Sequence, residues 1–238
     1  MKVEIFSILD LNCNKNNPQM LPLYLKHYSE RFPNCVFNIY LSNYPDNYDG
    51  DDINILKSKN CNIEKIKLGN ATYISDFSKI TDLQCKIKFN NDYINYLNKE
   101  RDFKNKIWKT SSADWIIVCD IDELLVISEK DLENVHEDVV QFMGYNMVRN
   151  NAKSTLDEIS YGFKSGSYDK TLLFRSSITD INFSIGSHTS KPSVPKHKIN
   201  KDKYKLFHYA ARYLDSDKNS LPELLELIKK YNTYDETI

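Results

Sequence analysis

The stretch ADWIIVCDIDELLVIS, Ala113–Ser128, carries an apolar run directly into three closely spaced carboxylates. The apolar run ends at Cys119 and has the pattern of a buried strand, and Asp120, Asp122 and Glu123 follow it. Carboxylates at this spacing repel one another, and their burial is costly unless positive charge lies beside them. The stretch therefore predicts a strand that ends in a site for a positively charged group.

Length and composition are those of one globular domain. The 238 residues are enough for a sizeable core, and hydrophobic residues make up 41% of them and charged residues 27%. The formal net charge of -1 gives no general electrostatic reason to bind nucleic acid or a membrane surface. The five cysteines are widely spaced and form no CxxC pair, which argues against a disulfide framework and a zinc-thiolate site.

The sequence shows no targeting or membrane segment. No stretch approaches the roughly 18 apolar residues of a membrane span, and Glu4 and Asp10 interrupt the apolar character of the N-terminus. We therefore expect a cytoplasmic chain without a membrane span. The sequence does not indicate an oligomeric state.

Strand and helix patterns alternate in the first half of the chain. The predicted strands are Val3–Asp10, Cys35–Ser42 and Asn62–Leu68, with helices over 19–32 and 52–60 between them. A helix over Asn91–Ser111 then leads into the apolar strand before Asp120. This order predicts an α/β fold with a parallel sheet and right-handed crossovers. Ligands of such sheets bind beyond the carboxyl ends of the strands, where Asp120 and Asp122 lie.

The second half of the chain has a different pattern. A helix is expected to begin near Ser128, and short strands and a terminal amphipathic helix follow. The strands are expected within 138–148, 171–176, 181–190 and 204–213, and the helix over 220–232. The simplest organisation is one domain with a smaller, mixed C-terminal half.

Asp120 and Asp122 have the spacing of a cation site. Residues two apart in a strand point to the same face, so just past the strand end both carboxylates can converge on one ion. Oxygen ligands suit Mg²⁺ or Mn²⁺, and such an ion also binds diphosphate oxygens and stabilises a leaving diphosphate. An isolated Asp-x-Asp is common, and the two residues would equally serve as solvated loop residues or helix caps. The strand and the alternating elements before them favour the cation site.

The segment KNKIWKTSSADWIIVCDIDELL, Lys104–Leu125, resembles the metal-binding region of GT-A fold glycosyltransferases, in particular a family-2-like branch with a DxDE motif. The matching features are the basic-Asn pair Lys104–Asn105, a small-acidic-aromatic step, the apolar strand and the DxDE itself. Three downstream segments match that branch in order: YDKTLLFRS, IGSHTS and KLFHYAARY. The resemblance runs from about Lys104 to Tyr213, and the N-terminal third is compatible with it.

This resemblance implies a fold and a reaction. The fold would be a Rossmann-like, mostly parallel central sheet flanked by helices, in a single domain over 1–238. Its nucleotide-binding half would be 1–122 and its acceptor-binding half 123–238. The enzyme would be a hexosyltransferase that uses Mn²⁺ or Mg²⁺ and a nucleoside-diphosphate sugar, expected to be UDP-linked. It would transfer the sugar with inversion to a hydroxyl of a glycan, glycolipid or protein.

The resemblance also implies roles for single residues. Asp122 would bind the metal directly, Asp120 would contact the ribose or reach the metal through water, and His208 would be the third ligand. A core histidine in a strand is the alternative for His208. The residues expected to bind the donor nucleotide sugar are Asp10, Asn12, Ser42, Asn43, Asn105, Asp120 and His188. Polar turns are the alternative for those that follow a strand.

The general base has no clear motif. An inverting transfer needs a carboxylate that deprotonates the acceptor hydroxyl. Asp169 is the predicted base, with Asp180 and Glu158 as alternatives, and Lys170 would serve phosphate or acceptor charge. Glu123 is the second predicted catalytic residue: it would bind the metal, orient the acceptor or contact the donor sugar. Alternatively it is a first-turn helix residue favoured by the helix dipole.

Two other functions fit parts of the pattern. A haloacid-dehalogenase-like phosphatase also has DxD after an apolar strand, but there the motif normally continues to Thr and lies on the first strand. Here Glu123 and Leu124 follow, in the middle of the chain. A non-catalytic module that binds carbohydrate or protein would explain the missing base.

Overall fold

The computed structural model describes residues 1–11, 17–69, 83–148, 155–159, 161–164, 169–184, 190–192 and 197–209, and it gives only the backbone for 83–90, 161, 190–192 and 201–203. Asn12, His188 and the helix expected over 220–232 lie outside the described residues.

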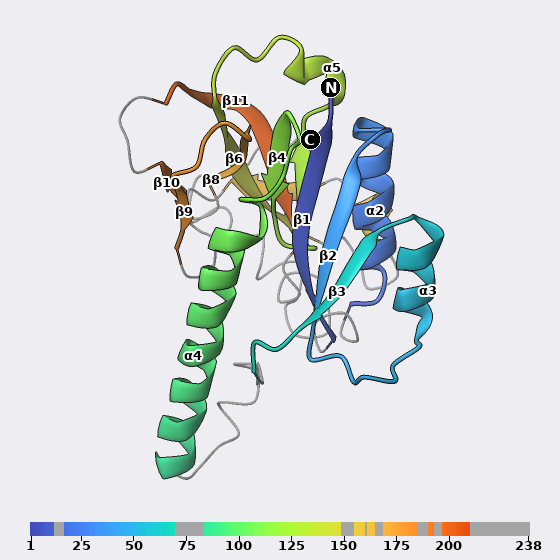
Figure 1. Cartoon of the computed structure of the whole chain (residues 1–238), viewed down its shortest axis with the longest axis vertical. Coiled ribbons are helices and arrows are strands. Elements are labelled where there is room, and N and C mark those ends of the chain that lie inside the picture. Colours follow the sequence, from blue (N-terminus) through green and yellow to red (C-terminus); the bar gives the residue numbers. More distant parts are fainter. Residues whose placement is uncertain are drawn as a thin grey trace.

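The first half of the chain forms the parallel part of the central sheet. The strands β1 (Val3–Asp10), β2 (Val36–Ser42), β3 (Asn62–Ile66) and β4 (Trp115–Val118) lie in the order β3-β2-β1-β4 (Figure 1). The helices along this part are α2 (Met20–Arg31), α3 (Asp51–Ser58) and α4 (Leu83–Ile107). Every residue of β4 is buried, as expected for a parallel strand covered on both faces. The predicted strand-helix alternation is confirmed.

The second half extends the same sheet with mixed strand directions. After β4 come β8 (Lys170–Arg175), β6 (Val139–Val148), β11 (Ile199–His208) and β5 (Glu123–Val126). β8 is antiparallel to both β4 and β6, whereas β11 is parallel to β6 and antiparallel to β5. β7 (Tyr161–Lys164) pairs with β6, and β9 (Ile181–Phe183) forms a separate hairpin with β10 (Ser190–Pro192). The α/β fold with a smaller mixed C-terminal half is confirmed.

Three details of the second half differ from the prediction. The segment after the aspartates forms β5, a strand that the sequence prediction did not include. It pairs with β11 at the edge of the sheet, and Leu124 and Leu125 are buried there. The helix expected near Ser128 is the short α5 (Glu129–Leu132), which begins with a capping box at Ser128. Where one strand was expected over 181–190, β9 ends at Phe183 and a second strand, β10, begins at Ser190.

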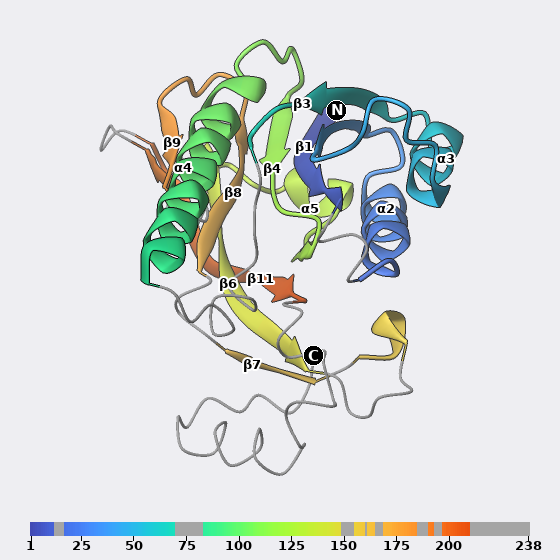
Figure 2. The same cartoon turned by 90° about the horizontal axis from the view of Figure 1, so that it is seen from below.

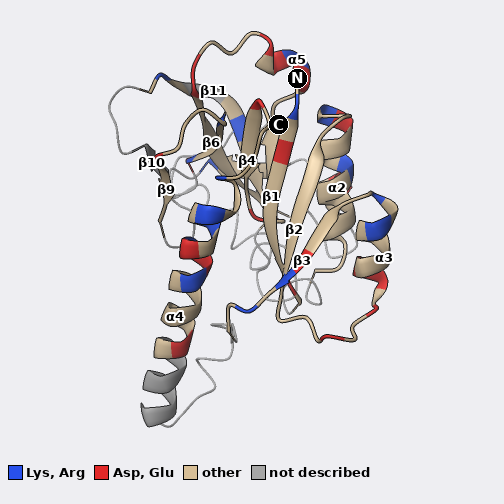
Figure 3. Cartoon of the chain, in the orientation of Figure 1, with Lys and Arg blue, Asp and Glu red and all other residues tan. Residues whose placement is uncertain are grey.

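Helices cover both faces of the sheet. Figure 2 shows α4 on one side and α2 and α3 on the other. Both signs of charge alternate along the described part of α4 (Figure 3), where Lys104 pairs with Glu100 one turn away. None of the described helices combines the length and apolar character needed to cross a membrane.

One buried tyrosine of α2 fixes the chain that follows β4. The Tyr28 hydroxyl is fully buried, donates to the Glu123 carbonyl oxygen at 3.0 Å and accepts from the Leu125 N–H at 3.1 Å. A buried peptide group that loses such a partner is left unsatisfied, which costs about 1–3 kcal/mol. Tyr28 therefore holds β5 in place from the neighbouring helix.

We expect Tyr28→Phe to lower the free energy of unfolding by about 1–3 kcal/mol, because the Leu125 N–H loses its acceptor. Urea denaturation would measure the change. The matched control is Tyr40→Phe: Tyr40 is half-buried on β2, and its ring packs edge-on against Phe103 at 4.9 Å, a contact that phenylalanine keeps. Equal losses in the two variants would contradict the role of the Tyr28 hydroxyl.

Candidate active site beyond the end of β4

The carboxyl ends of the parallel strands bring several predicted residues to one edge of the sheet. Asp10 at the end of β1 lies opposite Ser42 at the end of β2. Asn43 follows in the left-handed region, with φ of 62°, and its amide donates to Asp10 Oδ2 at 2.5 Å. The Tyr96 hydroxyl of α4 reaches the same carboxylate oxygen at 3.5 Å. Three residues predicted to bind the nucleotide are thus neighbours, as the parallel sheet requires.

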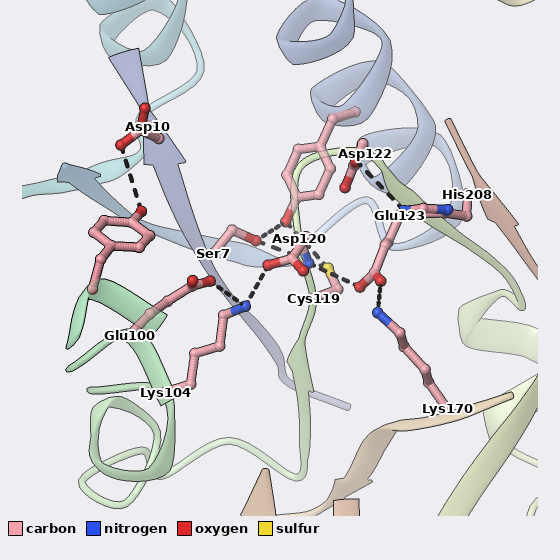
Figure 4. A network of polar contacts seen from close by, with 12 residues as sticks. Ser7, Asp10, Glu100, Lys104, Cys119, Asp120, Asp122, Glu123, Lys170 and His208 are labelled. Carbon is pink, nitrogen blue, oxygen red and sulfur yellow. Dashed lines mark hydrogen bonds and ion pairs between the residues drawn. The ribbon is translucent and has the colours of Figure 1, made fainter. Parts of the chain in front are cut away.

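Asp120 is held by a buried lysine. Lys104, in the last turn of α4, is buried and donates to Asp120 Oδ1 at 2.5 Å and to Glu100 at 2.8 Å (Figure 4). Burial alone would raise the pKa of Asp120, but the charges of Lys104 and Lys170, together with the hydrogen bond from Lys104, hold that pKa below its ordinary value. Asp120 therefore stays ionised, and its side chain keeps 29% exposure at the strand end.

Glu123 lies inside the protein at the start of β5. Its carboxylate forms an ion pair with Lys170, the first residue of β8, and accepts the Asp120 backbone N–H at 3.0 Å (Figure 4). The side chains are 1% and 2% exposed. Burial would lower the pKa of Lys170, but the Glu123 and Asp120 carboxylates raise it above its ordinary value. This geometry favours a positioning role for Glu123, and the catalytic role expected from the sequence stays a prediction.

Asp122 faces His208, which arrives from the far end of the chain. His208 is the last residue of β11 and lies opposite Glu123 in the β5–β11 pairing. Its Nε2 lies 3.6 Å from Asp122 Oδ2, and the Tyr209 N–H donates to the Asp122 carbonyl oxygen at 2.8 Å (Figure 4). The Asp122 side chain is 38% exposed and that of His208 11%. The structure thus brings the two predicted metal ligands together at the protein surface.

Asn146 of β6 sets the orientation of His208. Its Oδ1 lies 2.9 Å from His208 Nδ1, and because an amide oxygen only accepts, Nδ1 carries the proton. In the neutral ring Nε2 then presents its lone pair toward the Asp122 carboxylate. A partner that holds the second nitrogen in this way is typical of metal-binding histidines. The role of Asn146 could not be predicted from the sequence, because only the β6–β11 register brings it beside His208.

The Asp122 carboxylate carries the least compensated charge of the three. Burial, followed by the Asp120 and Glu123 carboxylates, raises the pKa of Asp122 to about 7. Among the described residues, the side-chain partner recorded for Asp122 is His208. A lone pair and a carboxylate oxygen 3.6 Å apart repel unless a proton or a metal ion lies between them.

These two residues fit a divalent cation. In the described part of the chain no group of three or more His, Cys, Asp or Glu side chains is placed to hold a metal. Asp122 and His208 provide one carboxylate oxygen and one imidazole nitrogen, which suits Mn²⁺. Mg²⁺ sites often have only one or two protein ligands, with phosphate oxygens and water in the other positions. Asp120 pairs with Lys104, and its contact with the metal through water stays a prediction.

The remaining predicted residues lie in other contacts. Both atoms of the Asn105 amide bind the Phe183 backbone, at 3.1 and 2.6 Å, and so tie α4 to β9. Asp169 accepts the Gly144 N–H at 2.9 Å. The alternative bases are also engaged: Asp180 with His197 at 2.8 Å, and Glu158 with the Thr155 N–H at 2.9 Å. No recorded contact among the described residues joins these carboxylates to Asp122.

Neither protein-family models nor curated proteins give a match to this chain. Similar solved structures include TarS of S. aureus in complex with UDP, at 11% identity and a TM-score of 0.40, covering 88% of this chain and 61% of that one. HddC from Yersinia pseudotuberculosis has 14% identity and a TM-score of 0.38, with 97% and 99% covered. The galactosyltransferase LgtC with donor and acceptor sugar analogues has 13% identity and a TM-score of 0.33, with 73% and 58% covered.

The chain spans 37% of a longer TarS chain and 57% of another LgtC chain. Because the TM-scores of these matches do not exceed 0.40, the function has to be inferred from the residues of the site.

We expect Asp122→Asn to stabilise the metal-free protein at about pH 8 but not at about pH 4. The pKa of Asp122, about 7, is raised above the ordinary carboxyl value, so folding disfavours the ionised form. The resulting loss of stability is absent below about pH 4 and complete above about pH 7. Melting temperatures of both proteins across this range would measure it.

The control for this experiment is Asp92→Asn, a change on the exposed surface of α4. It should melt like the wild type at every pH. Excess Mn²⁺ at about pH 8 should raise the melting temperature of the wild type and leave that of Asp122→Asn unchanged. A variant that is less stable than the wild type in metal-free buffer at about pH 8 would contradict the charge assignment.

Proposed function

We propose that this chain is a metal-dependent GT-A glycosyltransferase of the family-2-like branch. It would transfer a hexosyl group from a nucleoside-diphosphate sugar, UDP-linked, to a hydroxyl acceptor. The observation that carries the proposal is the meeting of Asp122 and His208 at 3.6 Å beyond the end of β4. Asp122 and His208 were identified from the resemblance in sequence alone. In the folded chain they lie together, at the edge where sheets of this kind bind ligands.

The donor would lie along the carboxyl edge of the parallel strands. Asp10, Ser42 and Asn43 form a polar rim there, in reach of the nucleoside. The Ser42 hydroxyl is completely buried and has no hydrogen-bond partner among the described residues, so it would contact the base or ribose only after the chain that covers it moves. Asp120 would contact the ribose or a metal-bound water through its exposed edge, while Lys104 keeps it ionised. Asn105 supports this edge by joining α4 to β9.

Asp122 and the Nε2 atom of His208 would hold the metal, Mn²⁺ or Mg²⁺. When bound there, the ion would neutralise charge that develops on the leaving diphosphate. Asp122 supplies the anionic ligand, and because Asn146 accepts from Nδ1–H of His208, Nε2 is the nitrogen whose lone pair faces the site in the neutral ring. The 38% exposure of the Asp122 side chain leaves room for phosphate oxygens to approach from solvent.

The acceptor half would supply the base and the acceptor hydroxyl's binding site. An inverting transfer needs a carboxylate on the side of the sugar opposite the diphosphate. Asp169 remains the proposed base; it lies at the start of β8, next to Lys170, whose side chain reaches the metal-site turn. A glycan, glycolipid or protein hydroxyl would be the acceptor.

We expect Asp122→Ala to abolish sugar release from every nucleotide sugar that the wild type accepts. A panel of UDP-, GDP- and other nucleoside-diphosphate sugars with Mn²⁺, scored for the free nucleoside diphosphate, would identify the donor. The matched control, Asp92→Ala, replaces an exposed carboxylate of α4 and should retain full activity. Chelation of divalent ions should remove the wild-type activity and added Mn²⁺ should restore it.

Two outcomes would favour the other functions. Hydrolysis of a simple phosphomonoester with a covalent phosphoaspartate on Asp120 would point to a phosphatase. Tight glycan binding without release of a nucleotide from any donor would point to a non-catalytic module. Unchanged UDP affinity of Asp122→Ala in the presence of Mn²⁺ would contradict the metal-dependent transferase directly.

A further inference from the structure

The Glu123–Lys170 pair is the most deeply buried ion pair recorded among the described residues. The side chains are 1% and 2% exposed and come from β5 and β8, which are not neighbours in the sheet. Replacing a buried ion pair by well-packed apolar residues is often neutral or stabilising, so burial in itself does not explain such a pair. Its geometry points to another task.

Glu123 uses its two carboxylate oxygens for different partners. One oxygen binds Lys170, and the other accepts the Asp120 N–H at 3.0 Å. The Glu123 N–H in turn donates to the Asp120 carbonyl oxygen at 3.1 Å. Asp120 and Glu123 are thus joined in both directions, and the turn between them, which contains Asp122, is closed at its base.

Lys170 fixes the direction of the carboxylate that closes the turn. Lys170 pairs with Phe142 of β6, and the rest of β8 is held between β4 and β6, which anchors this residue in the sheet. Without the ammonium group, the Glu123 side chain would lose the cation that holds one oxygen toward β8 and leaves the other for the Asp120 N–H. In this closed form the turn presents the Asp122 side chain to His208.

We propose that Glu123 and Lys170 are positioning residues that lock the turn after β4 so that Asp122 meets the imidazole of His208. The inference deepens the proposed function and rests on it, because it concerns the geometry of the same cation site. It makes the geometry of that site depend on Lys170 of β8, within the acceptor half.

Two neutral double variants test the inference. Glu123→Gln with Lys170→Met removes both charges and keeps a carbonyl oxygen that can accept the Asp120 N–H. Glu123→Leu with Lys170→Met removes both charges and that acceptor, at similar volume. Mn²⁺ affinity, measured by the loss of the free-ion electron paramagnetic resonance signal, should be about 10–100-fold weaker in the Leu variant than in the Gln variant. Because the Leu variant leaves the Asp120 N–H without its acceptor, its metal-free melting temperature should lie about 2–10 °C below that of the Gln variant, and both affinities are measured below both transitions.

Mn²⁺ affinities of both double variants equal to that of the wild type would overturn the inference, since the pair would then only fill space. If the Leu variant does not fold, hydrogen exchange in the wild type decides the question. The Asp120 amide should be protected like the amides of β4 although it lies outside the strand, and exchange at the rate of an open loop would overturn the inference. Absence of Mn²⁺ binding in the wild type would overturn the proposed function, and the inference with it.

Discussion

Repulsion among three carboxylates in one short turn is the constraint on which the site depends. Asp120, Asp122 and Glu123 follow a fully buried strand, and no residue within the turn offsets their charge. The compensating charges come from elsewhere in the chain, as Lys104 of α4 and Lys170 of β8, both almost completely buried. A buried lysine is costly on its own, as is a buried carboxylate. The turn, α4 and β8 therefore stabilise one another's charges, and none of them could keep this arrangement alone.

The strand order makes this compensation possible. β8 lies beside β4, so its first residue reaches the turn that follows β4. β11 lies between β6 and β5, so its last residue has Asn146 on one side and the turn on the other. β5 is the strand that joins these two regions, because Glu123 begins it and His208 lies opposite Glu123. The mixed half of the sheet thus encloses the end of the parallel half.

Local pattern in the sequence was enough to predict the parallel strands and the position of Asp120 and Asp122 at a strand end. Apolar runs and their spacing determine those elements. Asn146 and the pairing of Glu123 with Lys170 could not be predicted, because they depend on which strands are neighbours and in which register. β5 was missed for the same reason: ELLV is too short to show a period, and its pairing with β11 makes it a strand. For Asn105 the sequence predicted a contact with the donor, whereas its side-chain amide binds the backbone of Phe183 in β9.

Lys104 pairs with both Asp120 and Glu100, and Lys170 pairs with Glu123. With Asp122, the four carboxylates exceed the two lysines by two negative charges, and Asp122 is the most exposed residue of the turn. A third lysine would weaken the reason for a cation to bind, and fewer lysines would leave a buried carboxylate without a partner. In its neutral form His208 would add a ligand without adding a charge, and the contact of its Nδ1 with Asn146 leaves Nε2 facing Asp122. A divalent cation in the proposed site would offset this excess of negative charge. Phosphate oxygens of a diphosphate and water would then fill the other positions of the ion.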